Sequence, residues 1–137
     1  MLTRKLIMYD ILVTYYKNYS NKPKELISRS TDLTYKKEIA VVFALSMVDD
    51  INRTKKKLLS VVGCNGKEYC SLKAEDFGKA KRRKAIRKIL SKLLEESDVA
   101  FMTFSYADNK TIEVVINKTK HNHITKLNKE ESKLLRK

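Results

Sequence analysis

The chain has 137 residues, and 30 Lys and Arg against 16 Asp and Glu give it a net charge of +14. A hydrophobic fraction of 42% suffices for one compact domain, while 3 glycines and 1 proline exclude collagen-like and Pro/Gly-rich disordered chains. No stretch of about 18 apolar residues is present, so no membrane-spanning helix is predicted. Asp10 and Lys17 interrupt the apolar N-terminal segment, which argues against a signal peptide.

The first predicted element is a helix over residues 2–19. Apolar side chains recur in this segment at spacings of three and four residues, which is typical of a helix with one buried stripe. The stripe residues expected to meet a second copy of the chain are Leu6, Tyr9, Val13 and Tyr16. Tyrosine is enriched at protein interfaces, so the sequence predicts a homodimer formed through this helix. Packing of the same stripe on the chain's own domain is the alternative.

Further helical segments are predicted before the first cysteine. Pro23 suits the first position of a helix and begins a short one over residues 23–29. The next helix, over residues 35–52, is apolar on nearly every side in its middle, which predicts a central place in the core. Residues 54–62 continue or restart that helix, and Gly63 is expected to end it as a C-terminal glycine.

Two cysteines flank a predicted loop. Five residues separate Cys64 from Cys70, a gap that matches no common zinc pairing, so reduced structural thiols, a loop disulfide and a metal site with His121 and His123 remain as alternatives. The His-Asn-His sequence is similar to the paired histidines of rolling-circle replication nucleases, but it follows the predicted strand and no carboxylate cluster accompanies it. Since no Gly-rich phosphate loop or hydrolase motif is present either, the chain is predicted to be no enzyme, with no cofactor and no small-molecule substrate.

The clearest helix of the sequence covers residues 79–96 and is anchored by a stripe of Ile and Leu. A very short strand at 69–70, a short helix over 72–77 and a turn at Gly78 precede it. The first fourteen residues of this helix contain no acid and eight basic residues: Lys79, Lys81, Arg82, Arg83, Lys84, Arg87, Lys88 and Lys92. A merely solvated helix would intersperse Glu four residues before Lys, so this block is predicted to face phosphate.

A β-hairpin is predicted after this helix, with strands over residues 99–106 and 111–117. Apolar residues occupy the even-numbered positions of both strands. A turn of three residues, 107–109, places both apolar sets on one face, whereas a turn of even length would split them. Asn109 tolerates the left-handed backbone that such a turn needs.

The order of elements from residue 35 onward resembles a winged helix-turn-helix domain. In this resemblance residues 72–77 are the supporting helix, 79–96 the recognition helix and 99–117 the wing. The resemblance implies a mainly α fold with a small β-hairpin, of the α+β class, with an additional N-terminal helix. It divides the chain into an N-terminal helical extension at 1–34, a winged-helix domain at 35–118 and a basic C-terminal tail at 119–137, with a frayed helix at 128–135.

The resemblance and the placement of charge together predict a DNA-binding protein. Residues 54–92 hold thirteen basic and three acidic residues, a net charge of +10. The residues expected to contact nucleic acid are Lys79, Lys81, Arg82, Arg83, Lys84, Arg87 and Lys88 on the basic helix, Asn109 and Lys110 at the hairpin tip, and Lys55, Lys56 and Lys57 on flanking phosphate. We therefore expect a transcriptional regulator of viral, plasmid or prokaryotic origin that binds double-stranded DNA in the cytoplasm, associated with the nucleoid and not with a membrane. An RNA-binding or ribonucleoprotein component, or a protein–protein adaptor on the same fold, is the alternative.

Overall fold

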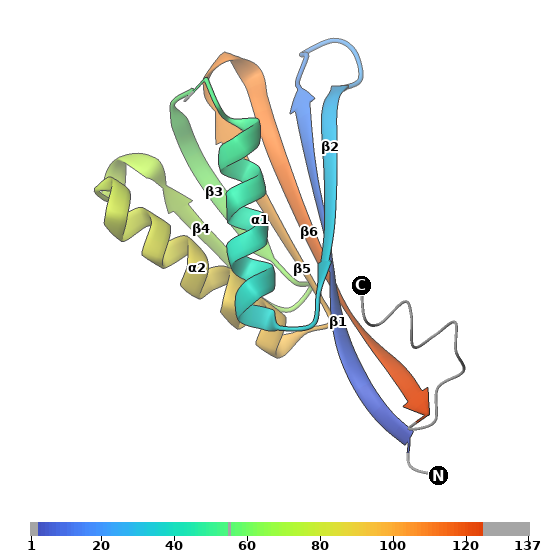
Figure 1. The fold of residues 1–137 in the computed structure, drawn as a ribbon. Helices are drawn as coiled ribbons and strands as arrows, with labels where there is room; N and C mark the ends of the chain where they lie inside the picture. The colour runs from blue at the N-terminus through green and yellow to red at the C-terminus, as the bar shows by residue number, and fades with distance from the viewer. Residues whose placement is uncertain (1–2, 55, 125–137) are drawn as a thin grey trace.

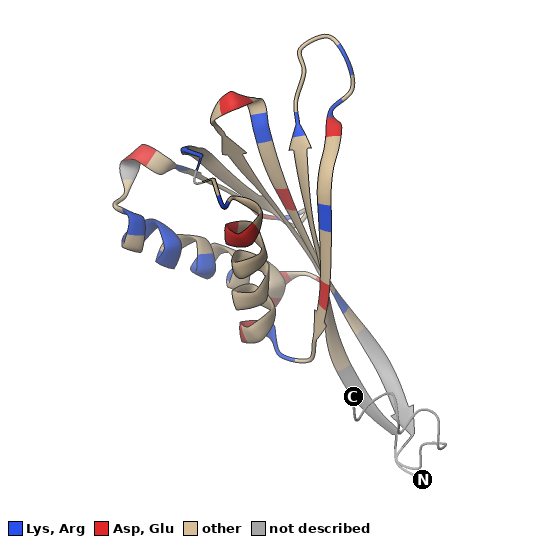
Figure 2. Ribbon diagram, turned by 45° about the horizontal axis from the view of Figure 1, so that its top comes forward, with Lys and Arg blue, Asp and Glu red and all other residues tan. Residues whose placement is uncertain are grey.

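One antiparallel sheet of six strands carries both helices on a single face, in a computed structural model that describes residues 3–54 and 56–124 (Figure 1, and from another side in Figure 2). The elements are β1 (Thr3–Lys17), β2 (Glu25–Thr34), α1 (Lys37–Ile51), β3 (Leu58–Cys64), β4 (Tyr69–Lys73), α2 (Lys79–Glu96), β5 (Val99–Tyr106) and β6 (Lys110–Ile124). Two short 3₁₀ turns, Ala74–Asp76 and Ala107–Asn109, precede α2 and connect β5 to β6. The order across the sheet is β2-β1-β6-β5-β3-β4, so β1 and β6 are central neighbours.

This architecture contradicts the predicted fold class, mainly α with a small β-hairpin, and the resemblance to a winged helix-turn-helix domain. The predicted helices over 2–19 and 54–62 are strands β1 and β3, and residues 25–29 of the predicted helix over 23–29 belong to β2. Residues 72–77 contain the end of β4 and a 3₁₀ turn, so the described chain has no supporting helix before α2. The β5–β6 hairpin is no wing either, because β3 and β1 flank it on both sides.

The error in β1 has a simple physical cause. A spacing of four residues is even, so Tyr9 and Val13 share a face in a strand as well as in a helix. Ile11, between them, is also buried, which shows a period of two rather than 3.6. The segment is rich in Ile, Val, Thr and Tyr, the β-branched and aromatic residues that suit a pleated sheet. Tyr16, three residues after Val13, accordingly lies on the other face.

Three predicted elements are confirmed. The helix over 35–52 is α1, the basic helix over 79–96 is α2, and the strand over 99–106 is β5. The hairpin register is also confirmed, since Met102 pairs with Val114 and Phe104 with Ile112, and all four side chains are buried beneath the helices. β6 is longer than predicted and continues through residues 118–124, while residues 128–135 lie outside the described part of the chain.

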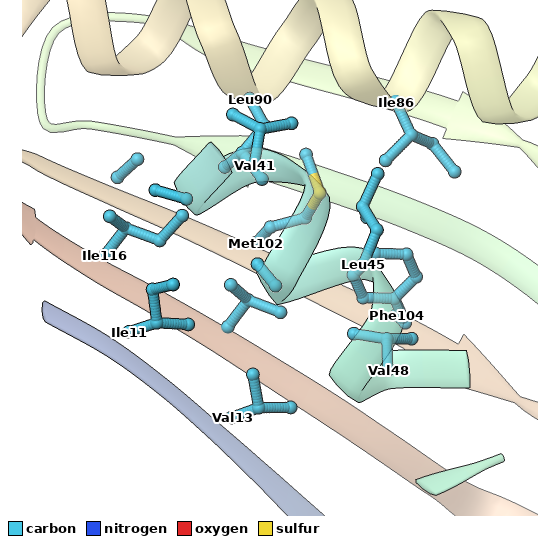
Figure 3. Packing of buried hydrophobic residues seen from close by; sticks show 14 of the residues in the cluster. Ile11, Val13, Val41, Leu45, Val48, Ile86, Leu90, Met102, Phe104 and Ile116 are labelled. Atoms are coloured by element: carbon cyan, nitrogen blue, oxygen red, sulfur yellow. The ribbon is translucent and has the colours of Figure 1, made fainter. Parts of the chain in front are cut away.

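The core lies between the sheet and the two helices. α1 packs over β1 and β2 and contributes Val41, Leu45 and Val48, whereas α2 packs over β3 and β5 and contributes Ile86 and Leu90 (Figure 3). The sheet supplies Ile11, Val13, Met102, Phe104 and Ile116 to the same cluster. Apolar burial on this scale is the dominant stabilising contribution to such a domain.

Gly63 does not end a helix as predicted, but lies within β3, opposite Cys70 of β4 and Met102 of β5. A Cβ atom built on it would lie 3.0 Å from Leu93 Cδ1, 3.1 Å from Ile89 Cγ2 and 3.3 Å from Met102 Cε. Glycine therefore lets α2 approach the sheet closely at this point.

The opposite face of the sheet carries no helix from the described part of the chain. Its middle is an apolar row that crosses adjacent strands, formed by Leu12 of β1, Val115 of β6, Phe101 of β5 and Cys64 of β3. The side chain of Phe101 is 45% exposed. Tyr69 of β4, which pairs with Cys64, extends the row to the edge and is 70% exposed. We call this row, with Tyr69, the open-face row.

The β5–β6 turn makes a first prediction about stability. Asp108 and Asn109 both have positive φ angles, of 66° and 58°, in the left-handed region. A β-branched residue is strained there, so we expect Asn109→Val to lower the free energy of unfolding by about 1–2 kcal/mol. Asn109→Gly should leave that free energy unchanged or raise it by a few tenths of a kcal/mol. Urea unfolding of both variants measures the difference, and equal stabilities would contradict this reading of the turn.

Candidate functional site

The exposed side of α2 is almost purely basic (Figure 2). Ile86, Leu90, Leu93 and Leu94 hold the opposite side of the helix against the sheet, which turns the charged positions outward. The exposed basic residues of α2 after Lys79 are Lys81, Arg83, Lys84, Arg87, Lys88 and Lys92. From Lys81 to Lys88 they span about 10 Å of helix axis.

Few carboxylates neutralise this surface. Among the side chains that the structure describes, which leave out those of residues 3–6, 76 and 120–124, the ion pairs made by α2 lysines and arginines join Arg83 Nη2 to Asp49 Oδ2 at 2.6 Å and Lys92 Nζ to Glu68 Oε1 at 3.7 Å. Three lysines, Lys81, Lys84 and Lys88, thus face solvent without a carboxylate partner in the described chain. We call these three the α2 lysine face.

The N-terminus of α2 adds to the positive potential. Gly78 precedes the first turn with an extended backbone and supplies no side-chain cap. The first turn contains no acidic residue, so the unpaired backbone N–H groups and the positive end of the helix dipole are not compensated locally. This end of α2 favours anions.

The structure brings Lys56 and Lys57 beside the β5–β6 turn, a proximity that the sequence did not indicate. Lys56 Nζ lies 3.0 Å from Asp108 Oδ2, and Ala107 N–H donates to the carbonyl of Lys57. The contact with Lys56 lowers the pKa of Lys110, and the hydrogen bond from the Lys56 ammonium lowers the pKa of Asp108. Asn109 is exposed, and its carbonyl accepts hydrogen bonds from Asn18. Lys55 lies outside the described residues.

A cleft of about 970 Å³ separates the C-terminal half of α1 from the N-terminal half of α2. Its basic lining residues are Arg53, Lys56, Lys57, Lys79, Arg82 and Arg83, and its acidic ones are Asp49 and Glu75. Apolar side chains of the core form its floor, among them Phe104 and Tyr106 of β5. Arg82 Nη1 donates to the carbonyl of Ala74 at 3.2 Å, which fixes one side of the cleft.

The predicted nucleic-acid residues therefore fall into separate groups. Lys56, Lys57, Lys79, Arg82 and Arg83 line the cleft, whereas Lys81, Lys84, Arg87 and Lys88 lie on α2 outside its lining. Asn109 and Lys110 lie at the β5–β6 turn beside Lys56. Sequence reasoning missed Arg53 and the aromatic floor; the former adjoins the basic run at 55–57, whereas nothing in the sequence indicates that Phe104 and Tyr106 border a cleft.

The alternatives for the cysteines are resolved by the pairing of β3 with β4. Cys64 pairs with Tyr69 on the open face, whereas Cys70 pairs with Gly63 on the face that bears the helices. Both cysteines are free, and their side chains leave the sheet in opposite directions, which is incompatible with a disulfide between them.

The metal site considered as an alternative, from Cys64, Cys70, His121 and His123, is not assembled. His121 lies six residues beyond Val115, the β6 residue in the same row as Cys64, which is about 20 Å along the strand. No cluster of three or more His, Cys, Asp or Glu that could hold a metal ion occurs within the described ranges.

The side chains predicted for dimerisation do not form one surface. Tyr9 and Val13 are buried in the core of their own chain, as the alternative reading of the stripe proposed. Tyr16 lies on the open face, where the ammonium of Lys24 is 4.2 Å from the centre of its ring. Leu6 pairs with His121 along the β1–β6 ladder. A helix 2–19 that pairs with a second copy is therefore excluded, because this segment is a strand.

Comparison of the chain with protein-family models, curated proteins and solved structures finds no match. Neither helix of the described chain is long and apolar enough to cross a membrane. The functional argument accordingly rests on the surface of α2, the cleft and the open face of the sheet.

Proposed function

We propose that this protein binds duplex DNA through the exposed basic side of α2, without catalysing a reaction on it. The observation that carries the proposal is the α2 lysine face, which lacks carboxylate partners within the described residues. A cationic helix attracts the phosphate backbone by releasing condensed counterions. A regulatory role on cytoplasmic DNA, as expected from the sequence, belongs to the same proposal.

The shape of the basic surface favours DNA over RNA. A single exposed helix face fits the B-DNA major groove, which is about 12 Å wide, whereas the corresponding groove of A-form RNA is too narrow for side chains to read. The rigid attachment of α2 to β3 and β5 would hold that face in a fixed orientation. Preference for RNA in direct competition is the result that would favour the alternative.

Salt dependence tests the electrostatic basis of this binding. Neutralisation of about six phosphates predicts a plot of log affinity against log salt with a slope of about −5. Fluorescence anisotropy with a labelled duplex between low and moderate salt measures this slope, with excess random duplex and RNA as competitors. A flat response would contradict the proposal.

We also propose that a second copy of the chain covers the open face of the sheet. Exposed apolar patches of this kind mark interaction surfaces. The described charges on this face nearly balance, because Asp10 and Glu113 lie among Arg29, Lys73 and Lys24, whose ammonium is 2.6 Å from Glu113 Oε2, so the face does not attract a polyanion as α2 does. Pairing two open faces would bury the row and leave the two α2 helices on opposite outer surfaces of the dimer, where each is free to contact DNA.

Phe101→Ser tests this dimer. We expect the wild-type chain to sediment as a dimer and the variant, which loses the central aromatic ring of the row, to sediment as a monomer at the same concentration. Tyr35→Ser is the matched control, because Tyr35 is similarly exposed, at 46%, but lies outside the sheet, just after β2. A monomeric wild-type chain would exclude the dimer. If the wild type is a monomer and Phe101→Ser binds RNA more weakly than it does, the row is a surface on which bases stack instead.

A further inference from the structure

We propose that the cleft between α1 and α2 binds a single nucleotide unit, with the phosphate at its basic rim and the base against its apolar floor. This inference concerns a site on the other side of α2 from the lysine face, so it does not rest on DNA binding by that face. It also goes beyond the sequence analysis, which predicted no small-molecule ligand.

The floor of the cleft suits a flat apolar ring. It combines Leu45 of α1, Ile86 of α2 and the aromatic residues Phe104 and Tyr106 of β5. These four residues are at most 6% exposed and belong to the packed core, so the floor is held in place before any ligand arrives. Its volume of about 970 Å³ falls within the range of clefts that hold small ligands.

The rim of the cleft suits phosphate. Six basic side chains stand against two acidic ones, and two of the six are already paired at short range, Arg83 with Asp49 and Lys56 with Asp108. Lys79 and Arg53 make no ion pair with a described carboxylate. Lys79 and Ala80 are also the first two residues of α2, whose backbone N–H groups have no side-chain cap. An ammonium, a guanidinium and a helix N-terminus thus line the rim of one cleft, and each is a group that binds phosphate.

The hydroxyl of Tyr106 provides an independent indication of a ligand. The residue is only 6% exposed, lines the cleft, and donates no hydrogen bond to any residue of the described chain. The hydroxyl oxygen is open to the cleft, because Glu68 Oε2 is the one unpaired atom shut off from solvent among the described side chains, and a ligand in the cleft can therefore supply its hydrogen-bond partner. Burial raises the pKa of Tyr106 far above its ordinary value, which keeps the hydroxyl protonated and able to donate at neutral pH. A ring nitrogen or sugar oxygen of a nucleotide is a suitable acceptor.

Calorimetric titration of the full chain at constant ionic strength tests the proposal. The probes are AMP, adenosine, inorganic phosphate and a short oligoadenylate with a 5′-phosphate. We expect AMP to bind at least about tenfold more tightly than adenosine or phosphate alone, because each of these reaches only one half of the site. If the oligoadenylate binds and AMP does not, the cleft takes the nucleotide at the end of a strand. In that case the variants described next should abolish oligoadenylate binding, and unchanged binding would exclude the site.

Two variants separate this site from general attraction of anions. Lys79→Gln should weaken AMP binding about fivefold or more, whereas Lys92→Gln, the same change on the same helix beyond the cleft, should leave it unchanged. Ala80→Trp should abolish binding without any change of charge, because Ala80 is exposed and its replacement fills the cleft. Three results would each overturn the proposal. They are equal affinities for AMP and phosphate, equal effects of Lys79→Gln and Lys92→Gln, and full AMP binding by a folded Ala80→Trp variant.

Discussion

Replacing Lys81, Lys84 and Lys88 together by Gln is expected to weaken binding to duplex DNA by about 10²–10³-fold at about 100 mM salt. Each phosphate contact adds about 0.9 to the slope of log affinity against log salt, which at this salt corresponds to about eightfold in affinity. The loss of three contacts should also reduce the slope from about −5 to between −2 and −3. Gln keeps the helix propensity and most of the side-chain length, so the change concerns charge.

A matched control distinguishes a defined surface from overall charge. The variant Lys22→Gln, Lys36→Gln, Lys67→Gln removes the same three charges from exposed positions outside α2. It should reduce affinity by less than about tenfold, because these three lysines lie in separate connections between elements and do not form one surface on a helix or strand. Equal losses in both triple variants would show that the protein binds DNA through its net charge and not through α2.

Gly63→Val is expected to lower the free energy of unfolding by about 1–3 kcal/mol. Valine has the better β propensity, so an unobstructed strand position would gain stability from this change. At Gly63, however, the new Cβ alone would meet Leu93, Ile89 and Met102 at 3.0–3.3 Å, and the two methyl groups beyond it need further space. We expect α2 to be displaced outward from β3, and urea unfolding measures the cost.

A double-mutant cycle assigns this cost to the contact with α2. Leu93→Ala alone should cost about 2–5 kcal/mol, because it leaves a cavity at a fully buried position. Combined with Gly63→Val it should cost at least about 1 kcal/mol less than the sum, since the valine fills part of that cavity. Ser71→Val on the exposed face of β4 controls for strand propensity. Additive losses in the double variant would exclude close packing of Gly63 beneath Leu93.

The sequence predicted an element correctly where the spacing of its apolar residues fits a helix or a strand but not both. α2 has a stripe with spacings of three and four over eighteen residues, and no strand of that length alternates in this way. The β5–β6 hairpin was defined by parity, because only an odd turn brings Met102 and Val114 to one face. For β1 the spacing from Tyr9 to Val13 fits both periods, and the helical interpretation then fixed a wrong topology for the rest of the chain.

The cleft depends on tertiary structure and could not be predicted. Its lining comes from the end of α1, the residues before and within β3, the turn before α2, the first turns of α2 and the end of β5. Lys79 and Arg53 were visible in the sequence as charges, but their place in one cleft with Tyr106 follows from the packing of both helices on one face of the sheet. The spacing of apolar residues indicates which face of a helix or strand is buried, but not which other element packs against that face.

The central position of β1 and β6 has a consequence for how the chain folds. The backbone register pairs Thr3 with Ile124, and Thr14 with Glu113, so the middle of the sheet joins segments about a hundred residues apart. Such high contact order slows folding, because a long loop must close before its contacts contribute. On the ribosome, β1 and β2 emerge first, and one edge of β1 has no strand to pair with until β6 has been synthesised. During this interval the unpaired edge of β1 is the part of the protein most open to association with other chains.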